Sequence, residues 1–178
     1  MKKVLMVVGL VTLVFLVLFV VIGFFLPTRV SVARTVTIHA DKPAVHAWCS
    51  DLKKWPEWTP WAEADKTVVT TLGPITSGVG ASQSWTGDSG NGELTLTQSD
   101  PNTGIAYDMN FINGEHKTPM KSAMTYRTSG DATEVTWTLD GDMDTPVLGG
   151  YVVLMMGGAI DAMFDQGLAK LKTKVEGK

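Results

Sequence analysis

The sequence predicts an α+β fold in which an antiparallel sheet wraps on a long C-terminal helix, with a transmembrane helix at the N-terminus. Three observations lead to this prediction. Residues 4–26 are apolar and carry no charge. Between residues 30 and 140, stretches of alternating apolar and polar residues are separated by turn residues, which indicates strands. Beyond Pro146 the apolar residues recur at spacings of three and four, which indicates a helix.

The N-terminal apolar segment is long enough to cross a bilayer. As a helix rising about 1.5 Å per residue it would reach about 34 Å, and the hydrocarbon core is about 30 Å thick. The alternative is a cleavable signal peptide, because Lys2 and Lys3 supply a positive start and residues 31–33 offer small side chains for cleavage. The apolar region of such a peptide has only about 7 to 15 residues. We therefore predict a membrane anchor in residues 1–28 and one folded domain in residues 29–178.

The distribution of charge excludes one class of partner and favours one orientation. The chain has 15 basic and 18 acidic residues, and no basic cluster exceeds the lysines between residues 170 and 174. Nucleic acid is therefore not an expected partner, because phosphate binding needs a concentrated cationic surface. Lys2, Lys3 and the terminal amine outweigh Arg29 and Arg34, which favours a cytoplasmic N-terminus by the positive-inside rule.

The first elements of the domain can be placed from residue 30 onward. Residues 30–38 alternate between apolar and small or polar side chains, which predicts a strand with one buried face. Asp41 can then cap a short helix whose first turn holds Pro43, where a missing N–H costs least. This helix is predicted to bury one face, because apolar residues recur along it at spacings of three and four: Val45, Trp48, Cys49 and Leu52.

A Trp-rich stretch, DLKKWPEWTPW at residues 51–61, follows this helix. Trp55, Trp58 and Trp61 recur every third residue, and two prolines stiffen the segment. The indoles can close one end of the core, or one or two of them can line the mouth of a pocket, where a rigid amphipathic ring meets an apolar ligand. Both interpretations bury Trp55 and differ in the role of Trp61, and Trp58 is expected to lie further out.

Six further strands are predicted from alternation and from the turn residues between them. Their ranges are 67–72, 81–86, 93–98, 105–112, 120–127 and 133–140. The alternation places one set of side chains on an inner face: Leu94, Leu96, Ile105, Tyr107, Met109, Phe111, Met120, Met124, Tyr126, Val135, Trp137 and Leu139. Polar residues such as Asp108 and Lys121 fall on the opposite face, so we expect one covered and one wet face.

A C-terminal helix of about six turns is predicted to cover the inner face. Its buried stripe contains Ile160, Phe164, Leu168, Leu171 and Val175. Gly157 and Gly158 lie in its apolar N-terminal part, although glycine is unfavourable in a helix interior. Close packing against the sheet or a kink would explain this pair, and so would a helix segment thinned where it roofs a cavity.

No catalytic constellation is visible in the sequence. The histidines His39, His46 and His116 lack metal-ligand spacing and are predicted at the surface. Cys49, the only cysteine, is predicted to be a small buried hydrophobe. We therefore predict no metal and no cofactor, and the catalytic residues are unknown. The polar side chains on inward positions are Gln83, Tyr107, Ser122 and Tyr126.

The order of the elements and several segments resemble a known superfamily. The segments are RTVTIHADKPAVHAWCSDLKKWPEWTPW, GVGASQSWTGDSGNGELTLT, TEVTWTLDGDM and FDQGLAKLK. Together they resemble the helix-grip fold of the START-like (SRPBCC) superfamily, in particular its membrane-anchored polyketide cyclase/dehydrase-like branch, over residues 30–176. The resemblance implies a Bet v 1-like architecture with a cavity between the sheet and the C-terminal helix. It says more about fold than about reaction.

The resemblance and the inward positions together predict a membrane-anchored domain that binds an apolar small molecule or lipid. The expected ligand-binding residues are Trp61, Trp85, Tyr107, Met109, Met124, Tyr126, Trp137, Met156 and Ile160. Two alternatives stay open: an enzyme of the polyketide cyclase/dehydratase type acting on an apolar substrate, and an interaction or stress-related domain with a closed core. The expected location is the bacterial inner membrane, crossed once, with the domain outside the cytoplasm. The oligomeric state is left open.

Overall fold

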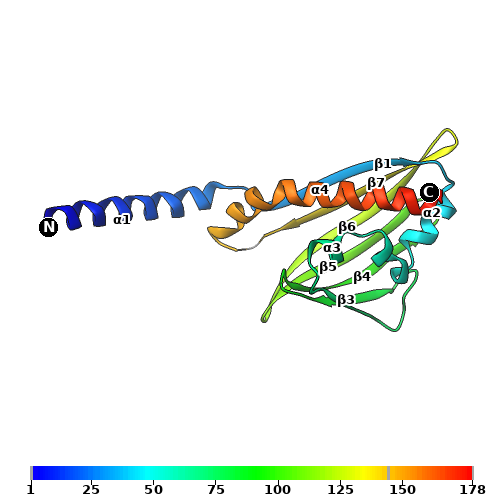
Figure 1. The fold of residues 1–178 in the computed structure, drawn as a ribbon, viewed down its shortest axis with the longest axis horizontal. Coiled ribbons are helices and arrows are strands. Elements are labelled where there is room, and N and C mark those ends of the chain that lie inside the picture. Colours follow the sequence, from blue (N-terminus) through cyan, green and yellow to red (C-terminus); the bar gives the residue numbers. More distant parts are fainter. Residues whose placement is uncertain (1, 144, 178) are drawn as a thin grey trace.

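The computed structural model describes residues 2–143 and 145–177 as an N-terminal helix followed by an α+β domain (Figure 1). Helix α1 (Lys2–Phe25) projects from one end of the domain, and among its residues only Gly23 is buried. Its apolar side chains are exposed along its length, from Val4 at 67% to Phe25 at 86%. Both α1 and the last helix are long and apolar enough to cross a membrane. Signal sequences and the core helices of soluble proteins meet the same criterion of length and composition.

Seven strands form one antiparallel sheet in the order β1-β7-β6-β5-β4-β3-β2. The strands are β1 (Arg29–Ile38), β2 (Val69–Leu72), β3 (Ser82–Thr86), β4 (Asn91–Asp100), β5 (Gly104–Asn113), β6 (His116–Ser129) and β7 (Ala132–Asp142). Strands β2 to β7 form a meander, and β1 returns beside β7, with Val32 opposite Leu139. The predicted α+β fold with one antiparallel sheet is confirmed.

The hairpin between β5 and β6 is tighter than the sequence predicts. Asn113 pairs with His116, so that only Gly114 and Glu115 form the turn, and Gly114 has a φ of 61°. A two-residue hairpin of this kind needs positive φ, which glycine adopts without strain. The loop expected over residues 113–119 is therefore wrong, and Pro119 lies within β6.

Three short helices connect β1 to β2: α2 (Lys42–Cys49), the 3-10 helix η1 (Leu52–Glu57) and α3 (Trp61–Ala64). Asp41 caps α2 as predicted, because its carboxylate accepts a hydrogen bond from the backbone N–H of Ala44 at 2.9 Å. Trp55 and Trp58 are both buried, with 2% and 0% exposure, so the expectation that Trp58 lies further out is wrong. A 3-10 helix has about three residues per turn and therefore brings side chains at a spacing of three onto one side.

Helix α4 (Leu148–Glu176) covers the inner face of the sheet and packs chiefly along β1 (Figure 1). Its 29 residues make about eight turns rather than six, because the helix already begins at Leu148. The predicted stripe is buried at Phe164, Leu168 and Leu171. The C-terminal half of α4 is therefore a core helix of the domain, whereas several apolar side chains of its N-terminal half are exposed.

Candidate ligand-binding site

A cavity of about 300 Å³ lies between the inner face of the sheet and α4. All seven strands contribute to its wall, together with α4, the η1–α3 segment and the turn after β3. The lining residues are Val30, Trp55, Trp61, Ala64, Asp65, Val68, Thr70, Gln83, Trp85, Ser89, Gly90, Leu94, Tyr107, Met109, Phe111, Met120, Trp137, Leu139, Met143, Met156, Ile160, Met163 and Phe164. Most of them are apolar or aromatic, and the volume is at the lower end of the range for small-molecule sites, about 300 to 1,000 Å³.

The structure brings seven of the nine predicted residues together at this cavity: Trp61, Trp85, Tyr107, Met109, Trp137, Met156 and Ile160. Met124 and Tyr126 are buried but do not line the cavity. Tyr126 instead meets His46 of α2 edge-on, with ring centroids 6.0 Å apart. Alternation assigns a side chain to one face of a strand, but not to a position relative to the cavity. The sequence therefore could not separate Met124 and Tyr126 from Met120, which does line the cavity.

The predicted set omits several lining residues. Six of them stand on inward positions of the predicted strands, so the sequence does carry a signal for them: Val30, Gln83, Leu94, Phe111, Met120 and Leu139. Trp55 and Phe164 were expected in the core, and they form part of both the core and the cavity wall. Alternation assigns no inward position to five other lining residues: Ala64, Asp65, Val68, Ser89 and Gly90. They reach the cavity because the segment after α3 and the turn after β3 fold over its rim.

Aromatic rings form one wall of the cavity. Trp137 of β7 stacks on Phe164 of α4, with ring centroids 4.0 Å apart and planes inclined by 18°. Trp58 and Trp61 approach Trp137 edge-on, at 5.5 and 6.0 Å. The Trp-rich stretch therefore has two roles. Trp55 and Trp58 close the core, and the half-buried Trp61 borders the cavity, which is the position that the pocket interpretation requires.

The polar groups nearest the aromatic wall are hydrogen-bonded to one another. Nε1 of Trp137 donates to the hydroxyl of Tyr107 and to Oγ of Ser122, each at 3.1 Å. Ser122 donates in turn to the backbone carbonyl of Thr138 at 2.5 Å. Burial raises the pKa of Tyr107 to about 12, so its hydroxyl stays protonated at neutral pH. Gln83, which is 9% exposed, is another polar residue of the cavity wall.

Asp65 holds the rim of the cavity in place. Its Oδ2 accepts hydrogen bonds from the backbone N–H and the hydroxyl of Ser89, at 2.9 and 2.7 Å. Its Oδ1 accepts the corresponding pair from Thr67, at 2.8 and 2.6 Å. These hydrogen bonds, first of all that from the Ser89 hydroxyl, hold the pKa of Asp65 well below its usual range. The ionised carboxylate therefore ties the segment after α3 to the turn after β3.

The three histidines and the cysteine differ in how deeply they are buried. Among residues 2–143 and 145–177, no group of three His, Cys, Asp or Glu side chains is placed to hold a metal ion. His39 and His116 are exposed as predicted, but His46 is half-buried, and burial lowers its pKa. The surface prediction is wrong for His46 because α2 turns it toward Ser99, whose Oγ lies 3.1 Å from its Nε2. Cys49 is fully buried as predicted, and burial raises the pKa of its thiol to about 12.

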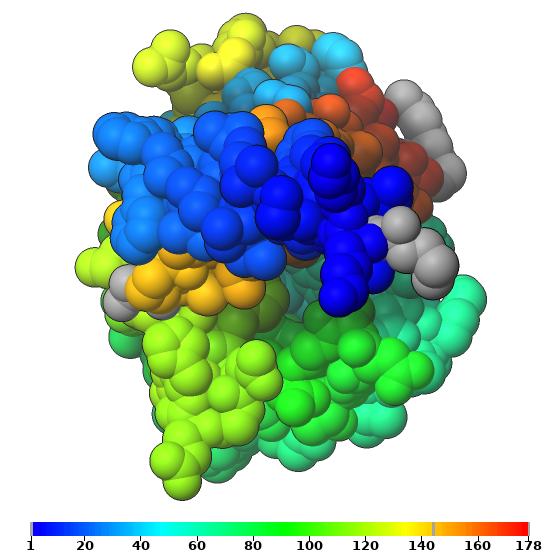
Figure 2. All heavy atoms as spheres, turned by 90° about the vertical axis from the view of Figure 1, so that its left-hand side faces the viewer, coloured from blue at the N-terminus to red at the C-terminus, as the bar shows by residue number. Residues whose placement is uncertain are grey.

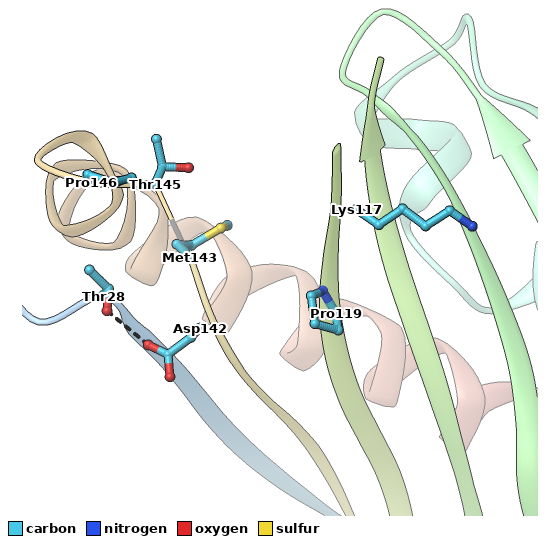
Figure 3. A pocket seen from close by; sticks show the side chains of 7 residues that line it. All are labelled: Thr28, Lys117, Pro119, Asp142, Met143, Thr145 and Pro146. Carbon is cyan, nitrogen blue, oxygen red and sulfur yellow. Dashed lines mark hydrogen bonds between the residues drawn. The ribbon is translucent and has the colours of Figure 1, made fainter. Parts of the chain in front are cut away.

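A second hollow, of about 440 Å³, opens at the end of the domain next to α1 (Figure 3). It is lined by Thr28, Lys117, Pro119, Asp142, Met143, Thr145 and Pro146. Thr28 donates a hydrogen bond to Asp142 at 2.9 Å. Lys117 points away from Asp142 and forms an ion pair with Glu93 at 2.7 Å. Because these polar groups already have partners, the apolar cavity is the stronger candidate for a binding site.

Comparisons with known proteins agree with this architecture. Residues 29–176 match the model of a family described as "Polyketide cyclase / dehydrase and lipid transport". The structure of CV1439 from Chromobacterium violaceum has 13% identity and a TM-score of 0.60, and the match covers 82% of this chain and 96% of that chain. The KanY protein has 18% identity and a TM-score of 0.61, with 83% and 98% covered. Ara h 8.0201 has 12% identity and a TM-score of 0.54, with 84% and 99% covered. No curated protein matches the sequence.

Proposed function

The chain belongs to the polyketide cyclase / dehydrase and lipid transport family, and on that premise we propose that it is a membrane-anchored domain that binds an apolar small molecule or lipid. The observation that carries the proposal is the cavity of about 300 Å³ between the sheet and α4. The proposed contact residues are Trp61, Trp85, Tyr107, Met109, Met120, Trp137, Met156, Ile160 and Phe164.

The composition of the wall supports an apolar ligand. Among the described residues that line the cavity, Asp65 alone is charged, and its carboxylate is already bonded to Ser89 and Thr67. Each 100 Å² of apolar ligand surface removed from water contributes about 2.5 kcal/mol. Methionines at five positions of the wall can adapt to an irregular ligand, and the rings of Trp61 and Trp137 offer rigid surfaces. Affinity should therefore depend on ligand size more than on ligand charge.

Helix α1 is the proposed anchor, with residues 29–178 as the ligand-binding domain. The support is that its apolar side chains are exposed on all sides, which is unfavourable in water and favourable in lipid. Lys2 and Lys3 at its start support a cytoplasmic N-terminus. The proposed location of the domain is the outer side of a bacterial inner membrane.

The enzyme alternative has less support. Of the four polar side chains considered from the sequence, only Gln83 and Tyr107 line the cavity. Tyr107 already accepts a hydrogen bond from Trp137, and its raised pKa opposes a role as a base at neutral pH. The alternative of a closed-core interaction domain is opposed by the cavity itself.

The proposal is tested by thermal unfolding of the full-length protein in detergent with a panel of fatty acids, sterols and aromatic polyketides. At least one ligand class should raise Tm, because a ligand that binds only the folded state stabilises it. Binding should weaken only slightly between low and high salt. A panel that leaves Tm unchanged would count against ligand binding. Strong salt dependence would instead indicate a charged ligand.

A further inference from the structure

We infer that the first part of α4, residues 148–156, lies in the boundary of the bilayer and forms the entrance through which an apolar ligand passes from lipid into the cavity. We call this segment the entrance segment. The inference rests on the proposed function, because it takes α1 as a membrane anchor. It adds a second membrane contact and a route of ligand entry.

The end of α1 is packed directly against the start of α4. A Cβ added to Gly23 would lie 2.6 Å from the backbone oxygen of Val147, and one added to Gly150 would collide with Leu26. The hydroxyl of Tyr151 donates to the backbone oxygen of Phe19 at 2.8 Å. Small residues at helix contacts of this kind are typical of membrane helices. Figure 1 shows the start of α4 beside the end of α1.

The ring of Tyr151 also stacks on that of Phe19, with centroids 4.4 Å apart and planes inclined by 3°. Phe19 lies within the apolar segment of residues 4–26. The ring of Tyr151 therefore contacts the apolar part of the proposed anchor, although Tyr151 belongs to α4, which starts beside the end of α1. Tyrosine is enriched at this depth of a membrane, because its ring is apolar and its hydroxyl polar.

The pairing of the two helices sets the depth of the entrance segment. Val147 lies against Gly23, and Gly150 lies against Leu26. The two helices point the same way, so α4 begins beside the end of α1 and continues away from it (Figure 1). Leu154 and Met155 therefore lie about 6 to 8 Å beyond the end of the apolar segment, at about 1.5 Å per residue. The interfacial layer on each side of the hydrocarbon core is about 5 to 8 Å thick. Both side chains thus fall within that layer.

The exposed side chains of the entrance segment are apolar. Leu148 is 50% exposed, Leu154 71%, Met155 82% and Met156 44%. Figure 2, which looks at the domain from the side of α1, shows the orange atoms around the start of α4 against the blue atoms of α1. Clustered apolar exposure beside a membrane anchor indicates a lipid-facing surface.

The same helical turn also reaches the ligand cavity. Met156 is both exposed and part of the cavity wall, and Ile160 continues that wall one turn further along α4. Gly157 and Gly158 lie between these two residues, and a Cβ at either position would meet no atom within 4 Å. Close packing therefore does not require these glycines, although each costs about 1 kcal/mol relative to alanine in a helix. Because the two glycines weaken α4 at this point, the helix can bend there and open a path from the lipid to the cavity.

The depth of the entrance segment is tested with a bimane label in vesicles. Met155→Cys and the matched control Val79→Cys are made in the full-length protein and reconstituted into phosphatidylcholine vesicles that contain brominated lipid. Val79 is also exposed, at 61%, but its loop bonds to Ser50 after α2, at the end of the domain opposite α1. Wild-type protein gives the labelling background, because Cys49 is buried.

We expect brominated lipid to quench the label at position 155 at least twofold and to leave the label at position 79 unchanged. Equal emission with and without brominated lipid at position 155 would overturn the inference. A blue-shifted emission that depends on protein concentration but not on bromination would also overturn it, because a second copy of the chain would then cover this surface.

The entrance role is tested by the rate of ligand uptake, with cis-parinaric acid as the probe. Leu154→Glu/Met155→Glu should take up the probe from preloaded vesicles at least tenfold more slowly than wild type, whereas Val79→Glu should match wild type. Affinity for the probe delivered from cyclodextrin should be the same in all three proteins. Wild-type uptake by the double variant would overturn the inference. If none of the three proteins binds cis-parinaric acid from vesicles or from cyclodextrin, the proposed function fails for fatty acids. The bimane experiment then still decides whether the entrance segment lies in the bilayer boundary.

Discussion

The indole of Trp137 stacks on the ring of Phe164 with centroids 4.0 Å apart, and this contact joins β7 to α4 at the wall of the cavity. Both side chains are almost fully buried, and both line the cavity. Gly167 leaves room for the indole, because a Cβ there would lie 2.9 Å from Cζ3 of Trp137. The size of the indole therefore helps to set the separation of sheet and helix, and with it the width of the cavity.

Replacing Phe164 with alanine should destabilise the domain by about 3 to 5 kcal/mol, because a stacked core ring is lost and the cavity grows. Urea unfolding of the full-length protein in detergent measures the change. Asp165→Ala, at the next and exposed position of α4, is the matched control and should stay within about 0.5 kcal/mol of wild type. A loss below about 1 kcal/mol for Phe164→Ala would contradict the packing of α4 described above.

Trp137 should be the main fluorescent reporter of a bound ligand. Trp137→Phe should remove most of the ligand-induced change in indole emission. The matched control is Trp48→Phe, because Trp48 lies outside the cavity, with Nζ of Lys54 5.1 Å from its ring centre. An emission change that survives in Trp137→Phe and disappears in the control would place the ligand elsewhere.

Protonation of Asp65 should make the domain less stable in acid. Its pKa is lowered on folding, so the folded state binds fewer protons than the unfolded state near the ordinary aspartate pKa of about 3.9. The stabilisation is present above that value and is lost as the pH falls toward the folded pKa. Asp65→Asn should therefore unfold at lower urea concentration than wild type at pH 7, and the difference should shrink at pH 3. A difference that does not change with pH would show that the charge of Asp65 is not the cause.

The proposed anchor should keep the protein in membranes washed with carbonate. Protease added to the outer side should digest residues after Arg29, because the domain is proposed to lie outside the cytoplasm. A soluble product with a new N-terminus near Arg34 would show that a signal peptide had been removed instead. Digestion only from the cytoplasmic side would reverse the proposed orientation.

The sheet and α4 could be predicted because each has a periodic signal along the chain. Alternation placed Met120 and Met124 on the same face, but only the assembled sheet shows that Met120 alone of the two borders the cavity. Trp58 was misplaced for a local reason, because the turn geometry of η1 is not visible in composition. His46 became half-buried through contacts with β4 and β6, which are distant in the sequence.

The rim of the cavity was not predictable from the sequence at all. Asp65 and Ser89 are 24 positions apart, and their hydrogen bonds require the turn after β3 to lie against the segment after α3. Contacts of this kind leave no periodic pattern in the chain. Tyr151 and Phe19 are 132 positions apart, and their contact depends on the direction in which α1 projects from the domain.

The central claim, that the cavity holds an apolar molecule, is tested most directly by native mass spectrometry of the detergent-extracted full-length protein incubated with a lipid extract. Wild-type protein should carry a bound molecule. Ile160→Trp, which fills part of the cavity, should carry much less, whereas the control Ala159→Trp, at the neighbouring exposed position, should bind like wild type. Equal occupancy in wild type and both variants, or no bound molecule in any of them, would contradict the account.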